Sequence, residues 1–195
     1  MSSVIISGDT SGQVTISAPA VAGSNTLTLQ AATATNAVNT LGTAVASTSG
    51  TSIDFTGLPS WIKRITVTLT GVSTSGTNSP QIQIGSGSVL TSGYTGIYST
   101  LTNAASVSSL SLSAGFRAGS YSGNTETNSG AFTLTLVGSN IWVCNAQVAN
   151  SSGYNSMGIC AGTVTLSGAL DRVRVTTVGS TDTFDAGTVN ILYEG

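Results

Sequence analysis

Histidine is absent from this sequence of 195 residues, and charged side chains make up only 6% of it. Without histidine, the chain has no Ser-His-Asp or Cys-His catalytic arrangement and lacks the most common general base near neutral pH. Ordinary globular domains carry about a quarter of their residues as Asp, Glu, Lys or Arg. We therefore expect a protein without enzyme activity, whose solubility depends on hydroxyl and amide groups.

Basic residues are also scarce: the sequence has five lysines and arginines in total and a formal net charge of −2. Nucleic-acid binding needs a basic surface that displaces counterions, so we expect no nucleic-acid partner. No apolar run approaches the about 18–20 residues of a membrane span, and the first residues do not resemble a signal peptide. We expect that the chain does not insert into a membrane and that it assembles in the cytoplasm.

The sequence has two cysteines, Cys144 and Cys160. Two thiols without histidine do not supply the four ligands of an ordinary zinc site, so we predict no metal and no cofactor. In a chain without a secretion signal, two cysteines are more often reduced packing residues than a disulfide. A disulfide remains the alternative if the fold brings the two residues together.

A strand pattern is clearest in residues 64–70, where Ile65, Val67 and Leu69 alternate with Arg64 and threonines. This period of two is typical of a half-buried strand. Similar short segments, separated by polar and glycine-rich stretches, occur at residues 81–84, 93–101, 106–113, 131–137, 140–148, 164–166, 170–178 and 188–193. Without a credible long helix, they predict an all-β fold, an antiparallel β-sandwich that is jelly-roll-like.

The first 45 residues differ from the rest because they contain one charge, Asp9, and no aromatic residue. We predict that residues 1–45 form an extended, β-rich N-terminal arm for assembly and that residues 46–195 form the β-sandwich domain. Isolated hairpins are marginally stable, so such an arm should be ordered against a partner. The strand candidates in it are residues 4–6, 13–17 and 26–29. In residues 31–51, the spacing of Val38, Leu41 and Val45 permits a short helix, but the Thr and Asn content favours a linker or an extended strand at least as much.

Four tyrosines lie in or beside polar segments, where an amphipathic ring can stack on a sugar and still form a hydrogen bond. They are the candidates for contact with a receptor or glycan, although surface tyrosine in a loop is common: Tyr94, Tyr98, Tyr121 and Tyr154. Two long polar loops, residues 115–130 and 149–158, contain the last two of them.

Asp182 and Asp185 in the segment TDTFDAG are the closest pair of carboxylates that suggests chemistry. They could bind calcium through loop oxygens, or face one another as glycosidase acids do. The interpretation that we favour is structural: Asp182 caps the turn, and Asp185 pairs with Arg172 or Arg174.

Three segments together resemble a domain of bacteriophage tail-fibre and virion structural proteins: FTGLPSWIKRITVTLTGVSTSGT, QIQIGSG and LDRVRVTTVGSTDTFDAGTVNILYEG. The resemblance covers roughly residues 45–195. It implies a protein of the virion surface without a catalytic motif, and it assigns no receptor-binding residue.

Most of the predicted strands carry no charge, although exposed β edges are normally guarded by lysine, proline or inward charges. We infer that neighbouring subunits cover the edges and one sheet face, and we predict a homotrimer. With the resemblance, two virion functions follow. One is a homotrimeric tail-fibre or receptor-binding tip that contacts a host surface glycan or receptor. The other is a capsid decoration (cement) protein whose N-terminal arm binds the shell, next to other virion proteins.

Overall fold

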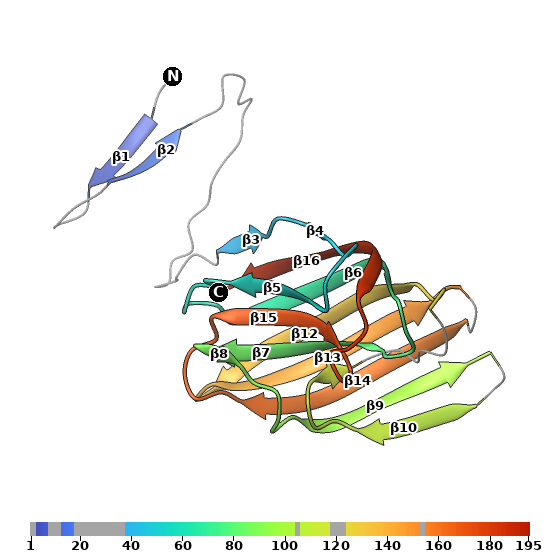
Figure 1. The fold of residues 1–195 in the computed structure, drawn as a ribbon. Helices are drawn as coiled ribbons and strands as arrows, with labels where there is room; N and C mark the ends of the chain where they lie inside the picture. Colours follow the sequence, from blue (N-terminus) through green and yellow to red (C-terminus); the bar gives the residue numbers. More distant parts are fainter. Residues whose placement is uncertain (1–2, 8–12, 18–37, 104–105, 118–123, 153–154) are drawn as a thin grey trace. The chain divides into compact units, whose positions relative to one another are not determined.

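The computed structural model describes residues 3–7, 13–17, 38–103, 106–117, 124–152 and 155–195. The chain divides into two compact units, Met1–Asn36 and Ala37–Gly195. In the first unit, β1 (Ser3–Ser7) pairs antiparallel with β2 (Gln13–Ser17), which confirms two of the three predicted arm strands (Figure 1). The third candidate, residues 26–29, lies outside the described residues.

The second unit consists of a large and a small antiparallel sheet, packed face to face (Figure 1). The strands of the large sheet are β3 (Asn39–Leu41), β4 (Val45–Ala46), β6 (Arg64–Thr74), β9 (Thr95–Thr102), β10 (Val107–Ser111), β12 (Asn128–Gly138), β13 (Ile141–Asn150), β14 (Ser156–Thr165) and β16 (Phe184–Glu194). Those of the small sheet are β5 (Ser52–Thr56), β7 (Pro80–Ser86), β8 (Ser88–Val89), β11 (Phe116–Arg117) and β15 (Arg172–Thr177).

The strand order of the large sheet is β10–β9–β14–β13–β12–β6–β16–β3, and β4 also pairs with β16. The small sheet has the order β11–β7–β15–β5, with β8 beside β7. Consecutive strands often change sheet, as β5, β6 and β7 do, and as β14, β15 and β16 do. The predicted antiparallel β-sandwich is confirmed, and this repeated crossing is its jelly-roll-like feature.

Alternation along the strands builds the core between the sheets. Ile65 and Val67 of β6 and Phe132 and Leu134 of β12 are completely buried, and their neighbours in sequence are polar or small. Across the core, Val173 and Val175 of β15 are also completely buried, whereas Arg172 and Arg174 point to the other side of the small sheet. The alternation of valine and arginine therefore gives β15 an apolar face and a basic face.

At the edge of the large sheet, the extended strand is the correct alternative for the segment that contains Val38, Leu41 and Val45. The described part of this segment forms β3 and β4, which pair with β16, and no helix. These strands belong to the second compact unit, which begins at Ala37 and therefore includes the end of the predicted arm.

The expectation that residues 149–158 form a polar loop was wrong. Instead, β13 continues to Asn150 and β14 begins at Ser156. The first four inward positions of β14 carry small residues, Ser156, Gly158, Cys160 and Gly162, so its sequence shows an apolar inward residue only at its end, at Val164.

Candidate functional site

Five neighbouring strands of the large sheet, β10–β9–β14–β13–β12, contain no charged residue. Their outward side chains, which face away from the core, form what we call the outer sheet face. One row of it runs across the strands in register and contains Ser111, Ile97, Ala161, Asn145 and Thr133. The outer sheet face is thus regular, pleated and uncharged.

One side of the outer sheet face is apolar. Its exposed apolar residues come from β9, β10 and β14, and each is between 41% and 68% exposed: Ile97, Leu101, Val107, Met157 and Ile159. We call them the apolar cluster. Leu101 lies opposite Val107 on one side and Met157 on the other, so they form a continuous row. Contiguous exposed apolar surface of this kind commonly marks an interaction site.

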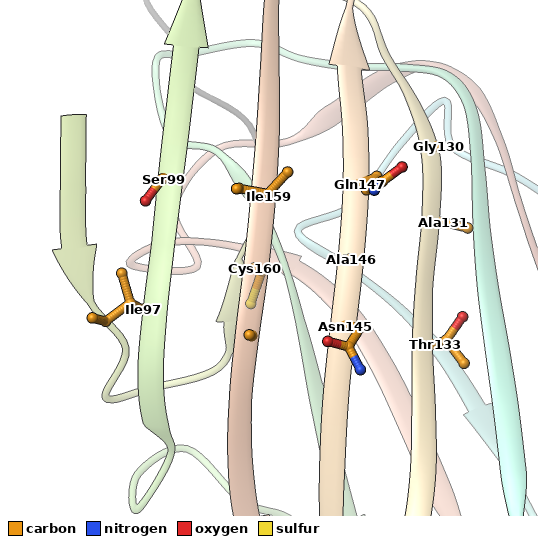
Figure 2. Close-up of a pocket in the computed structure, with 11 residues that line it drawn as sticks. Ile97, Ser99, Gly130, Ala131, Thr133, Asn145, Ala146, Gln147, Ile159 and Cys160 are labelled. Carbon is orange, nitrogen blue, oxygen red and sulfur yellow. The ribbon is translucent and has the colours of Figure 1, made fainter. Parts of the chain in front are cut away.

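A hollow of about 770 Å³ lies beside the apolar cluster, on β9, β14, β13 and β12 (Figure 2). Its described lining combines aliphatic groups such as Ile97 and Ile159 with the hydroxyl of Thr133 and the amides of Asn145 and Gln147. Among these lining residues there is no carboxylate or basic group. The hollow can therefore offer apolar contact and hydrogen bonds, but no acid–base pair.

Sequence reasoning missed this surface because it treated apolar residues as core residues. The signal that could have revealed it is the alternation in β14, where Met157 and Ile159 are separated by glycine. Glycine at Gly158 and Gly162 marks the inward positions, so the larger side chains must point outward.

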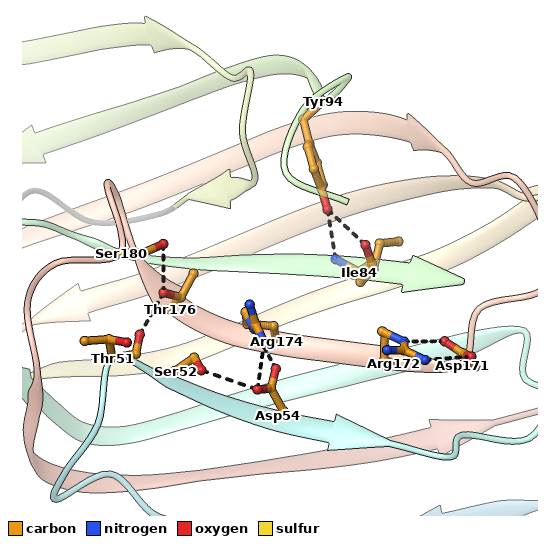
Figure 3. Close-up of polar contacts among 10 residues, drawn as sticks. All are labelled: Thr51, Ser52, Asp54, Ile84, Tyr94, Asp171, Arg172, Arg174, Thr176 and Ser180. Carbon is orange, nitrogen blue, oxygen red and sulfur yellow. Dashed lines mark hydrogen bonds and ion pairs between the residues drawn. The ribbon is translucent and has the colours of Figure 1, made fainter. Parts of the chain in front are cut away.

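Two arginines of β15, Arg172 and Arg174, lie on the outer face of the small sheet and pair with nearby carboxylates (Figure 3). Arg174 donates hydrogen bonds to Asp54 at 2.6 and 3.0 Å, and Arg172 donates to Asp171 at 2.7 and 3.1 Å. Hydrogen bonding to Arg172 lowers the pKa of Asp171 below its ordinary value. The expectation that Asp185 pairs with Arg172 or Arg174 is wrong, because both arginines bind other carboxylates.

Asp182 has a structural role, although the loop that it stabilises is not the turn of its own segment that we expected it to cap. Its Oδ2 accepts a hydrogen bond from the backbone N–H of Asn78 at 2.8 Å, which fixes the loop between β6 and β7. Asp185 is exposed on β16. In the described parts of the chain, no group of three or more His, Cys, Asp or Glu residues is placed to hold a metal ion.

Tyr94 and Tyr98 are core residues, which corrects the expectation that they lie at the surface. Tyr94 is 2% exposed, and its hydroxyl accepts a hydrogen bond from the Ile84 N–H at 2.8 Å (Figure 3). Burial raises the pKa of Tyr94 to about 12. Tyr98 is 6% exposed, and the guanidinium of Arg117 lies 4.3 Å from its ring centre. Neither ring is available to a glycan, whereas Tyr121 and Tyr154 lie outside the described residues and stay predictions.

Cys144 and Cys160 are both free and buried, on the neighbouring strands β13 and β14. A hydrogen bond to Cys160, together with burial, raises the pKa of the Cys144 thiol. The two residues are reduced packing residues, as we expected.

The described residues include no helix with the length and apolar character needed to cross a membrane. No family model, curated protein or solved structure matches the chain.

Proposed function

We propose that this chain is a non-enzymatic structural protein of a bacteriophage virion, which acts as a homotrimeric tail fibre or receptor-binding tip. The observation that carries the proposal is the uncharged outer sheet face with its apolar cluster. A surface of this kind suits permanent contact with protein better than contact with water. The resemblance to tail-fibre and virion proteins supplies the setting.

The receptor contact in this proposal has fewer candidate residues than the sequence indicated. Tyr94 and Tyr98 are buried, so a glycan would have to contact other groups, of which Tyr121 and Tyr154 are the remaining tyrosine candidates. Substituting each of these two tyrosines with alanine and measuring adhesion of the purified protein to host cells tests this part. Unchanged adhesion in both variants would remove the tyrosines from the proposal.

Capsid decoration is the second candidate, and one observation favours it. Residues Met1–Asn36 form a compact unit of their own, in which β1 and β2 pair with each other. A separate small unit of this kind is suited to attach a sandwich domain to a shell. In this alternative, the protein binds capsids lacking it and increases their resistance to heat.

Gold-labelled antibody against the protein, applied to intact virions of the phage that encodes it, distinguishes the two locations in electron micrographs. Label at the tail supports the fibre, and label over the head supports decoration. Virions without label, alongside positive labelling of the purified protein, would overturn the assignment to the virion.

A further inference from the structure

The charged residues of the sandwich are unevenly distributed, since the large sheet carries the ion pair Arg64–Glu194 on β6 and β16 only. On the small sheet, β15 and β5 bear Arg172, Arg174 and Asp54, and each of the two arginines forms an ion pair. On the large sheet, five neighbouring strands bear no charge. Because both faces belong to one domain with one composition, the low overall charge of the sequence does not explain the difference.

We propose that the outer sheet face is covered by other copies of this chain. The proposal deepens the suggested homo-oligomeric virion protein and rests on it, because it names the surface through which the copies associate. In a cyclic homo-oligomer such as a trimer, each copy contacts its neighbours through two different patches, and a face of five uncharged strands buries no unpaired charge in either contact. A charged partner would find no opposite charge on these five strands.

The polar groups on this face are partly satisfied within it, which lowers the cost of removing water. Ser99 and Ser109 hydrogen bond to each other at 2.7 Å, and Thr95 and Thr163 do so at 2.9 Å. Buried polar groups are costly mainly when they lack a partner. Paired hydroxyls beside the apolar cluster can therefore be covered by another protein surface.

The area of the face is sufficient for a stable contact. The five strands, of five to eleven residues each with a rise of about 3.4 Å and a spacing of about 4.8 Å, give a face of about 700 Å², within the range of about 600–1,000 Å² per partner in standard interfaces. A standard protein interface buries about 800 Å² on each partner. The apolar cluster supplies the part from which water is excluded, as the centre of an interface requires.

A glycan is a less suitable occupant of this face. Aromatic rings provide the stacking surface for sugars, but the aromatic residues of these strands, Tyr98, Phe132 and Trp142, are buried on the inner side. The outward residues are aliphatic, hydroxyl and amide side chains. This composition suits contact with another protein surface, and the absence of charge favours a second copy of this chain as that protein.

Multi-angle light scattering of the full-length protein over a range of concentrations, with charged variants, tests the proposal. Ile159→Glu and Leu101→Glu each place a carboxylate in the apolar cluster, and Thr56→Glu, on the exposed side of β5 opposite Arg172, is the matched control. We expect an oligomer in the wild type, weakened at least about tenfold by either cluster variant and unchanged by the control. Circular dichroism establishes that each variant is folded.

Oxidative footprinting of the wild-type protein provides a readout without any substitution. Met157 is 48% exposed in the isolated chain, so its oxidation should slow severalfold at the concentrations where the oligomer forms. A monomeric wild-type protein, or an oligomer in which Met157 stays reactive and both cluster variants still assemble, overturns the proposal. Neither result affects gold labelling of virions, so the failure of this interface and the failure of the virion assignment can be distinguished.

Discussion

Arg174 of β15 donates two hydrogen bonds to Asp54 of β5, from Nε to Oδ1 and from a terminal nitrogen to Oδ2. Both side chains are about one-third exposed, at 34% and 35%, so water screens the attraction. We predict that a double-mutant cycle of Arg174→Gln and Asp54→Asn gives a coupling energy of about 0.2–1 kcal/mol. Urea unfolding at low and high salt measures it. The coupling should shrink in high salt, and a value of several kcal/mol that ignores salt would contradict this account.

Phe132 is completely buried on β12, among side chains of both sheets. Phe132→Ala removes a large apolar group and leaves a cavity, so we expect a loss of about 3–5 kcal/mol in the free energy of unfolding. Val137→Ala on the same strand is the control, because Val137 is 68% exposed and its loss should be within about 0.5 kcal/mol. Equal losses in the two variants would show that Phe132 is not in a packed core.

The hydroxyl of Tyr94 predicts an alkaline limit to stability. Its pKa is about 12 in the folded protein and 10.0 as its ordinary value, so the unfolded chain loses the proton first as the pH rises. The contribution of the protonated Tyr94 hydroxyl to the free energy of unfolding is fully present below pH 10 and is lost between about pH 10 and 12. Tyr94→Phe should flatten this part of a pH profile of unfolding. It should also reduce stability at neutral pH by about 1–3 kcal/mol, because the Ile84 N–H loses its acceptor. An identical alkaline slope in both proteins would remove Tyr94 from the explanation.

Gly187 lies where β16 passes close to β6. Its φ is +97°, and a Cβ added there would lie 2.5 Å from the backbone carbonyl of Gly71. Gly57 also has a positive φ, +70°, but nothing lies within 4 Å of the added atom. Gly57→Ala therefore measures the conformational cost alone, about 1–2 kcal/mol. We expect Gly187→Ala to lose at least about 1–3 kcal/mol more in thermal or urea unfolding. Equal losses would show that the close approach is not a constraint.

The sequence predicted the strands in which apolar residues face the core and polar residues face outward. Ile65, Val67 and Leu69 in β6 follow this rule, as do Val173 and Val175 in β15, and both strands were identified. The segments 131–137 and 140–148, which lie in β12 and β13, were also located, because glycine between them interrupts two such patterns. Local period and turn chemistry were sufficient there.

The same rule failed where the large sheet reverses it. In β14, Cys160 and two glycines point inward while Met157 and Ile159 point outward, so residues 156–158 were assigned to a loop and only the end of the strand, from Val164, was predicted. The prediction for Tyr94 was wrong for a related reason. Its polar neighbours suggested a surface position, but its hydroxyl accepts a hydrogen bond from the backbone N–H of Ile84 on β7. Contacts between distant segments decide such cases, and a single sequence does not show which segments meet.

The ion pairs of Arg172 and Arg174 lie on the small sheet, away from the five uncharged strands. This position affects the size of any particle that this chain forms. Copies that meet through their uncharged strands leave these charged residues on the outside. Each chain also brings its net charge of −2, so the exterior of the particle becomes more negative with every copy added. Repulsion between such exteriors opposes further association. The arrangement therefore favours small, closed particles that stay dispersed, and it opposes growth into a precipitate.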